Sequence, residues 1–425
     1  MRLSKPRIGL VTLSLPRERV DRASFWLKRA REVLPRAGLE LMAHEEAALS
    51  VEDSLEAVNR LVQEGAEGII YLIGTWIYAP MVVEPVRRFK LPALLWSPPD
   101  PAAFSLVGTA VAYGSLRELG LSPEICYGAP EDVLDKVRVF ANACKVLSRL
   151  KGCKLGLFGG HTMGMYTALS DPLQIKRLFG LEIEHIDQHV LIAEMEKVEK
   201  EEVERVEGLL KERVRDVLAP REALERAIRL YLALKKVVKE RGLNAVGVKC
   251  QPELIDEVGS ACLAMSMLND EGIVASCECD INGAITMKIL YLLSGGPVIF
   301  ADVNSLDLKN RELRLINCGS FPMRVAGKEG VFAPYTEGDV RLAVQHTVTM
   351  KYGVVTNITP DIRITFYNAG HILGSSIIHI HIGEGFHNVI YTGDFKFENS
   401  RTLDASAFKF PRAETLIMES TYGAT

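Results

Sequence analysis

Residues 272–304 read GIVASCECDINGAITMKILYLLSGGPVIFADVN, and this stretch decides the fold. It predicts a strand over Ile273–Asp280, a helix over residues 283–293 and a second, wholly apolar strand over Pro297–Ala301. A strand–helix–strand unit of this length is right-handed, and its two strands are parallel and close to each other. The stretch therefore favours an α/β protein with a parallel sheet.

Each predicted strand carries a carboxylate at its carboxyl end. Alternation along the first strand places Glu278 and Asp280 on one face, and the second strand is followed by Asp302. Ligands of α/β proteins bind at this edge, so Glu278 and Asp302 are the candidate catalytic pair and the candidate ligands of a divalent metal. The residues alone leave simpler roles open: Asp280 caps the helix, Asp302 caps a turn, or Glu278 pairs with a basic residue.

Composition limits the classes of function. The 425 residues include 50 basic and 54 acidic ones, a net charge of −4, which gives no electrostatic argument for nucleic acid. Eight cysteines without a C-x-x-C pair, and no secretory leader, favour a cytoplasmic protein. The longest uncharged apolar run, residues 68–83, is too short to span a bilayer, so no membrane partner is expected.

The pattern of elements divides the chain into four parts. Apolar strands without alternation alternate with helices over residues 1–130, which predicts an α/β domain whose parallel sheet is covered on both faces. A second α/β domain, residues 131–304, carries the acidic site, and residues 305–330 begin a further, truncated domain. Short alternating strands over residues 331–425 predict a β-rich segment.

Two more residues are candidates for substrate binding. Trp76 follows a predicted strand, where one aromatic ring and a few hydroxyls can bind a small polar ligand. His161 lies in the glycine-rich loop GGHTMGM, residues 159–165, which is not a phosphate-binding loop. The alternatives are that Trp76 is an ordinary core residue and that His161 is a polar loop residue.

Residues 1 to about 330 resemble the L-fucose/L-arabinose isomerase superfamily. The resemblance is carried by GGHTMGMYTALSDP (159–172), VKCQPEL (248–254), NDEGIVASCECDINGAITM (269–287) and IFADVN (299–304). It implies that Glu278 and Asp302 bind Mn²⁺ or another divalent cation and move protons during aldose–ketose exchange through an enediol. It also implies a small-molecule sugar substrate and a homo-oligomer, a trimer or hexamer.

The sequence departs from the isomerase pattern at one point. The family completes its metal site with a histidine from a C-terminal domain, and that domain breaks off here shortly after Cys318, which stands where some relatives have the histidine. Impaired turnover is therefore expected.

Residues 331–425 resemble archaeal β-CASP metallo-β-lactamase nucleases of the cleavage-and-polyadenylation-specificity-factor type. The carrying stretches are DIRITFYNAGHILGSSIIHIHIG (361–383), VIYTGDFKFENSRTLD (389–404) and FPRAETLIMESTYG (410–423). The resemblance implies that His371 and Asp394 are weak candidates for Zn²⁺ binding. The family's H-x-H-x-D-H stretch is absent, and His379 and His381 are interpreted as residues of one strand.

The expected fold is thus two parallel-sheet, Rossmann-like α/β domains followed by a metallo-β-lactamase-like fragment, which we interpret as a gene-level fusion or a mis-assembled reading frame. The leading functional hypothesis is a sugar ketol-isomerase. One alternative is a fragment of a β-CASP RNA-processing nuclease, the only reading with a nucleic-acid partner. The other is a non-catalytic sugar-binding module.

Overall fold

The computed structural model groups the chain into two compact units, Arg2–Ser148 and Arg149–Thr425. The residues that the structure describes are 4–160, 164–307, 312–317, 319–326, 331–333, 341–343, 349–351, 353–359, 362–368, 376–382, 387–391 and 415–417. Within these residues, no helix is both long and apolar enough to cross a membrane.

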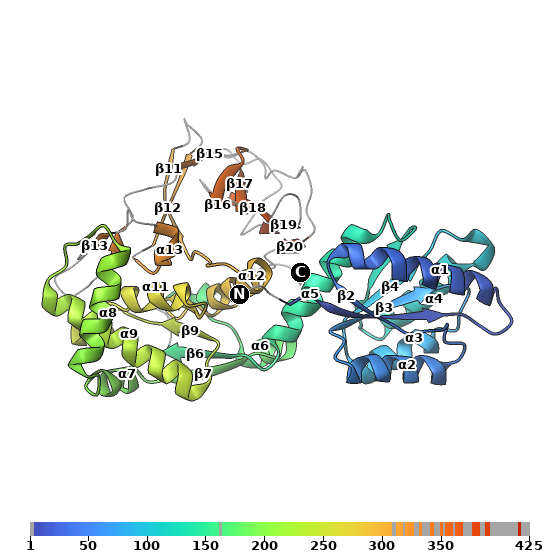
Figure 1. Ribbon diagram of the computed structural model, residues 1–425, viewed down its shortest axis with the longest axis horizontal. Helices are drawn as coiled ribbons and strands as arrows, with labels where there is room; N and C mark the ends of the chain where they lie inside the picture. Colours follow the sequence, from blue (N-terminus) through green and yellow to red (C-terminus); the bar gives the residue numbers. More distant parts are fainter. Residues whose placement is uncertain are drawn as a thin grey trace. The chain divides into compact units, whose positions relative to one another are not determined.

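A parallel sheet forms the centre of the first unit. Its strands are β1 (Arg7–Leu13), β2 (Glu40–Ala43), β3 (Gly68–Ile73), β4 (Ala93–Ser97) and β5 (Glu124–Tyr127). They lie in the order β2-β1-β3-β4-β5, and every neighbouring pair is parallel. The helices are α1 (Val20–Val33), α2 (Val51–Gln63), α3 (Pro80–Phe89) and α4 (Ser105–Glu118). Figure 1 shows α1 on one side of the sheet and α2 with α3 on the other.

Helices cover both faces of this sheet, as the apolar strands predict. Trp26 and Leu27 of α1 pack on one face together with Phe140 of α5 (Leu134–Leu150). Leu61 of α2 and Met81 of α3 pack on the opposite face. All six residues of β3 are consequently buried. The helix α5, which the sequence analysis placed in the second domain, lies with the first sheet.

The second unit contains another parallel sheet, in the order β10-β9-β6-β7. Its strands are β6 (Lys154–Phe158), β7 (Glu182–Ile186), β9 (Ala245–Val248) and β10 (Val274–Cys277). The helices are α6 (Pro172–Phe179), α7 (Gln188–Met195), α8 (Lys200–Arg213), α9 (Arg221–Arg241), α10 (Glu253–Glu257), α11 (Cys262–Asp270) and α12 (Ile281–Ser294). The prediction of two α/β regions with parallel sheets is confirmed.

One face of this second sheet contacts the largest apolar cluster of the chain's described part. Val246 and Cys277 contribute from the sheet, and Ile228 and Leu234 from α9. Periodicity predicts a single helix over residues 252–268, but the structure forms α10 and α11 with a break between them. Gly259, with φ of +119°, lies at this break, a backbone angle that ordinary residues avoid.

The second strand of the opening stretch is not formed, which corrects the sequence analysis. Pro297–Ala301 is irregular, and the next strand is β11 (Asp302–Asp307), which pairs antiparallel with β12 (Glu312–Ile316). An apolar segment can be buried without forming hydrogen bonds to a neighbouring strand. Here Phe300 packs against the apolar cluster of the second unit, and the segment joins no sheet. Glu278 and Asp302 therefore do not follow neighbouring parallel strands.

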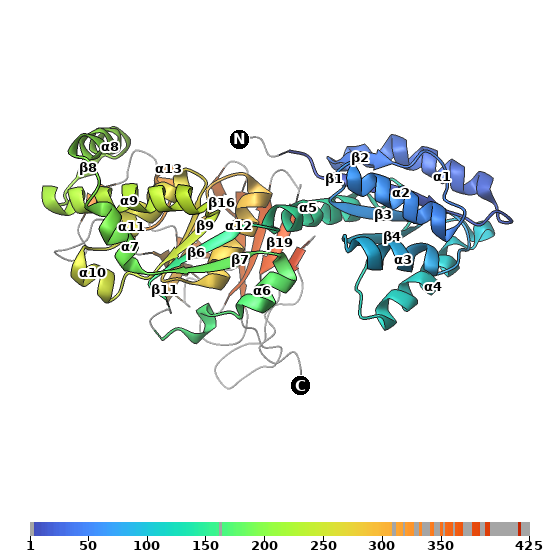
Figure 2. The same ribbon diagram turned by 90° about the horizontal axis from the view of Figure 1, so that it is seen from below.

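The C-terminal part is rich in antiparallel strands, as predicted. Five strands form a sheet in the order β16-β17-β18-β19-β20: β16 (Thr356–Thr359), β17 (Ile362–Asn368), β18 (Ser376–Ile382), β19 (His387–Tyr391) and β20 (Thr415–Ile417). All neighbours are antiparallel except β19 and β20, which are parallel. Figure 2 shows these strands in orange to red.

Three short elements precede this sheet, after α13 (Met323–Ala326). The strand β13 (Val331–Ala333) pairs antiparallel with β14 (Arg341–Ala343) and parallel with β8 (Asp216–Val217). The strand β15 (Thr349–Lys351) pairs with β12. Strand pairing thus joins residues on both sides of the domain boundary that the sequence predicts near residue 330.

Candidate functional site

A tight turn after β10 positions the predicted acidic site. Glu278 and Cys279 have φ angles of +60° and +55°, a left-handed conformation that is costly for residues with a side chain. The Cys279 thiol is buried and donates to the carbonyl oxygens of Phe158, at 3.1 Å, and Gly247, at 3.3 Å. These bonds hold the turn against β6 and β9, which explains how two strained residues persist.

Asp280 is the N-cap of α12. Its carboxylate accepts a hydrogen bond from the backbone N–H of Gly283 at 2.7 Å. Burial raises the pKa of Asp280, the N–H groups of Gly283 and Asn282 lower it, and the charge of Asp302 raises it further. The simpler reading of Asp280, as a helix cap, is therefore confirmed.

The sequence analysis expects Glu278 and Asp302 at the ends of neighbouring parallel strands, whereas the structure places the two residues at strands of different sheets. Glu278 is half-buried in the turn after β10, whereas Asp302 is exposed at the start of β11, in a different sheet. The described residues include no group of three or more His, Cys, Asp or Glu side chains that could hold a metal ion. A catalytic or metal-binding role of Glu278 and Asp302 stays a prediction without the geometry on which it was based.

The loop after β6 lies beside the N-terminus of α12. The Asn282 side chain donates to the carbonyl oxygen of Thr167 at 2.8 Å and accepts from the Ser170 hydroxyl at 2.6 Å. His161, the candidate substrate-binding residue of this loop, lies outside the described residues. Its role is therefore still a prediction.

The carboxyl edge of the first sheet is closed by its own hydrogen bonds. The buried hydroxyls of Ser14 and Thr75 are 3.0 Å apart, and Ser105 donates to the carbonyl oxygen of Gly74 at 2.9 Å. Trp76 is half-buried, packs against the apolar cluster on one face of the sheet, and meets Tyr78 edge to face at 5.2 Å. This placement is that of a residue at the border of the core, and sugar binding by Trp76 stays a prediction.

Sequence reasoning missed a buried carboxylate at the same edge. Asp100 accepts hydrogen bonds from Arg22 Nε at 2.7 Å and from Trp26 Nε1 at 3.1 Å. Burial raises the pKa of Asp100, but these hydrogen bonds outweigh it, and the pKa lies below its ordinary value. The sequence did contain a signal for this residue. Asp100 follows Ser97-Pro98-Pro99 directly after a buried strand, at the sheet edge where functional side chains often lie.

The two histidines of β18 are strand residues, as predicted. His379 is fully buried and its ring centroid lies 4.0 Å from that of His381. The His381 ring is hydrogen-bonded through Nε2 to the Thr365 hydroxyl at 3.1 Å and through Nδ1 to Asn388 Oδ1 at 2.7 Å. Because both ring nitrogens of His381 have protein partners, this pair does not form half of an H-x-H-x-D-H metal site.

The weak candidates of the C-terminal segment, His371 and Asp394, lie outside the described residues. Two donors are fewer than the three or four protein ligands that zinc sites use. His371 and Asp394 by themselves thus do not make a complete zinc site.

Comparison with known proteins relates part of the chain to archaeal termination factors. No family model matches. The curated transcription termination factor FttA of Methanocaldococcus jannaschii is 56% identical over 102 residues, which are 24% of this chain and 16% of that protein. The factor of Methanothermobacter thermautotrophicus is 58% identical over 99 residues, which are 23% of this chain and 16% of that protein. The factor of Thermococcus kodakarensis is 40% identical over 158 residues, which are 37% of this chain and 23% of that protein.

Solved structures are similar only at low scores. A glucose-galactose binding protein from Geobacillus stearothermophilus is 14% identical with a TM-score of 0.18, covering 70% of this chain and 94% of that one. A solute-binding protein from Actinobacillus succinogenes with bound D-allose is 13% identical with a TM-score of 0.20, covering 69% and 94%. At these scores the likeness carries no argument about function.

These comparisons overturn the isomerase assignment. The curated relatives named here are termination factors, so the resemblance to the L-fucose/L-arabinose superfamily and the aldose–ketose reaction are wrong expectations, and no finding supports Mn²⁺. They were drawn from short acidic and glycine-rich stretches that many α/β proteins share. The β-CASP-like motifs lie after residue 330, but the matches of 102 and 158 residues are longer than the 95 residues of that segment, so they extend upstream of it. What is related is thus a part of this chain, and it spans about a sixth to a quarter of the length of these factors.

Proposed function

We propose that this chain acts in nucleic-acid processing through its C-terminal segment, which contributes part of a β-CASP-type zinc centre and does not complete it. The observation that supports this most strongly is the 56% identity over 102 residues to an archaeal transcription termination factor. Hydrolysis would then require zinc ligands in addition to His371 and Asp394.

The architecture of the C-terminal sheet agrees with the proposal that this segment is one part of a larger domain. It has five strands, and its described buried apolar residues include Phe366, Ile377 and Ile390, with Tyr367 packed against the last two. Sheets with few buried apolar residues gain stability when a further layer covers them. The remainder of a β-CASP enzyme would be such a layer.

The chemistry of the two candidate ligands also agrees. A neutral imidazole from His371 and a carboxylate from Asp394 are both ligands that Zn²⁺ accepts, and bound Zn²⁺ would activate water for attack on a phosphodiester. With only these two donors, we expect less than one zinc ion per chain after purification. We also expect no RNA cleavage by the chain alone.

A complementation experiment tests the proposal. The purified chain is mixed with a Methanocaldococcus jannaschii FttA from which the matching 102 residues have been removed. Zinc content and cleavage of a labelled RNA are measured for each component and for the mixture. The mixture is expected to bind more zinc than the sum of its parts and to cleave RNA.

Two variants decide whether His371 takes part. His371→Ala is expected to lower cleavage by the mixture at least about tenfold, the loss typical of a disturbed metal site. His189→Ala, an exposed histidine of α7, is the matched control and should leave cleavage unchanged. Cleavage by the chain alone, or a mixture as inactive as its components, contradicts the proposal.

The proposal includes a cytoplasmic location and a nucleic-acid partner. Among the described residues, seven cysteines form no disulfide, which supports a reducing compartment. The homo-oligomer and the sugar substrate expected from the isomerase resemblance have no finding that supports them.

A further inference from the structure

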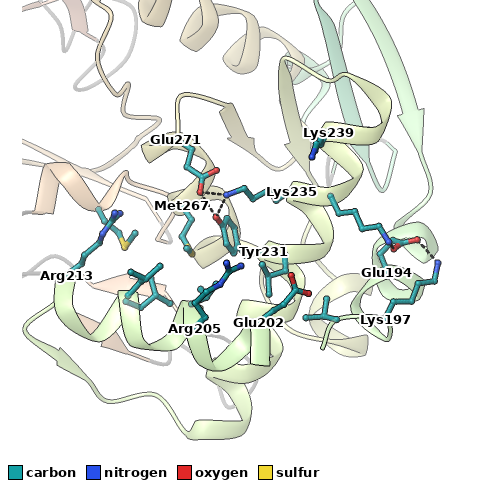
Figure 3. Close-up of a pocket in the computed structure, with 17 residues that line it drawn as sticks. Glu194, Lys197, Glu202, Arg205, Arg213, Tyr231, Lys235, Lys239, Met267 and Glu271 are labelled. Atoms are coloured by element: carbon teal, nitrogen blue, oxygen red, sulfur yellow. Dashed lines mark hydrogen bonds and ion pairs between the residues drawn. The ribbon is translucent and has the colours of Figure 1, made fainter. Parts of the chain in front are cut away.

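A cavity in the second unit has a lining that includes neither Glu278 nor Asp302. It has a volume of about 560 Å³ and is lined by α8, α9, α11 and the segments next to them. Figure 3 shows its lining side chains, with Tyr231 near the centre. This volume is in the range of small-molecule sites, so the question is which ligand its lining would accept.

The inner wall of the cavity is apolar. Val206 and Leu210 of α8, Met267 of α11 and Met323 of α13 line it, and all four are at most 8% exposed. Methionine side chains adapt to ligands of different shape. This wall suits a hydrocarbon body, not a sugar, which needs many hydrogen-bonding groups.

The rim of the cavity carries an excess of positive charge. Six basic residues line the cavity, but only three acidic ones, Glu194, Glu202 and Glu271. Glu194 already pairs with Lys197 and Lys236, each at 2.6 Å, and Glu271 pairs with Lys235 at 2.8 Å.

Three cations remain available to a ligand. Arg205, Arg213 and Lys239 form no ion pair with another residue within the described ranges. Figure 3 shows Arg205 and Arg213 extending from α8 toward the space between α8 and α9. An arginine guanidinium binds a carboxylate through two parallel hydrogen bonds, so this side of the cavity is suited to an anionic group.

A polar network fixes the opposite wall. Lys235 Nζ donates to the Tyr231 hydroxyl at 2.9 Å, and that hydroxyl donates to Glu271. Burial, followed by the bond to Glu271, raises the pKa of Tyr231 to about 12, so the phenol stays neutral at physiological pH. Lys235 and Glu271 neutralise each other, so the cations left for a ligand are Arg205 and Arg213 on α8 and Lys239 on α9.

We propose that this cavity binds an amphiphilic organic anion, a carboxylate attached to a hydrocarbon body. The body would lie against Leu210 and Met267, and the carboxylate would pair with Arg205 and Arg213. The proposal does not rest on the candidate metal ligands of the C-terminal segment, so it concerns a second function of the chain.

Calorimetry on the full chain with three probes tests this inference. Decanoate has both features, decanol has the hydrocarbon body without the charge, and inorganic phosphate has charge without the body. Decanoate is expected to bind at least tenfold more tightly than either of the others, and its affinity should fall as the salt concentration rises. Equal binding of decanol, equal binding of phosphate or no binding of decanoate would overturn the proposal.

Two double variants locate the site. R205Q/R213Q should weaken decanoate binding at least tenfold. K200Q/K211Q removes the same charge from α8 at residues that do not line the cavity, and binding should be unchanged. Equal weakening by both pairs would indicate a general charge effect and would also overturn the proposal. Circular dichroism melting of each variant confirms that α8 remains folded.

Discussion

The first sheet and the last sheet of this protein have the same number of strands and differ in how they are covered. In the first, helices that follow each strand bury both faces, and β3 has no exposed residue. In the last, the polar residues Thr365, His379 and Asn388 are buried together with a few apolar side chains. In a parallel sheet, the helices that connect the strands also cover the two faces. The last sheet instead buries hydrogen-bonded polar side chains, and its faces need other parts of a protein to cover them.

The largest expected effect tests whether the two sheets unfold separately. All three tryptophans, Trp26, Trp76 and Trp96, lie in the first unit, so their fluorescence reports on that unit alone. Trp96→Ala removes a fully buried side chain and should lower the stability of the first unit by about 3–5 kcal/mol. Denaturant titration followed by the remaining two tryptophans measures the change.

The matched variant is Phe366→Ala in β17, where the side chain is 1% exposed. It should leave the tryptophan transition unchanged while it accelerates hydrogen exchange in the last sheet. A shift of the tryptophan transition as large as that of Trp96→Ala would show that the two sheets unfold together.

The ion pair between the buried Asp100 and the partly exposed Arg22 gives the next largest effect. Asp100→Asn weakens the bonds from Arg22 and Trp26 and should cost about 1.5–3 kcal/mol at pH 7. Because the pKa of Asp100 is lowered in the folded state, its stabilisation is complete above the unfolded value near 3.8 and is lost as pH falls through the folded value. The difference between wild type and variant should therefore shrink toward pH 2; a difference independent of pH would argue against this carboxylate as its source.

In the last sheet, the comparable polar contact joins His381 to Thr365 and Asn388. His381→Ala removes the ring's hydrogen bonds to Thr365 and Asn388, which should cost about 1–2 kcal/mol. Hydrogen exchange of β17, β18 and β19 should speed up accordingly, and His189→Ala serves as the control. Unchanged exchange would mean that these bonds add nothing to the sheet.

The smallest effect is expected at the helix cap of the second unit. The pKa of Asp280 is raised, so its charged form is disfavoured in the folded state, and stability falls as pH rises from the unfolded value near 3.8 to the folded value. Asp280→Asn keeps the cap and removes this penalty, so the variant should lie within about 0.5 kcal/mol of wild type at pH 7. Chemical denaturation at pH 3 and pH 7, followed by circular dichroism, measures the size and the sign of the difference in unfolding free energy between the variant and wild type.

Sequence patterns predicted most of the fold because burial and periodicity are local properties. The bounds of β1, β6, β17 and β18 are those that the residues indicate, and α9 begins and ends where its apolar repeat does. Pairing is not local, and this is where prediction failed. Pro297–Ala301 has the composition of a buried strand, yet Phe300 packs on a cluster and no ladder forms.

The candidate site was less predictable than the fold for the same reason. Asp280 could be assigned as a cap because its partner, the N–H of Gly283, is three residues away. The pairing of Glu278 with Asp302 required a sheet neighbour that does not exist. The cavity beside α8 was invisible to sequence reasoning, since Arg205 and Arg213 look like ordinary exposed residues of a highly charged helix.

The short parallel pairing of β13 with β8 affects how a cut chain would behave. Residues 331–333 are hydrogen-bonded to residues 216–217, far upstream in the sequence. A protease that cleaves between residues 326 and 331 would break the covalent link but not this backbone contact. The two fragments would then separate on a denaturing gel and still migrate together through a sizing column, so a nicked preparation could pass for an intact one.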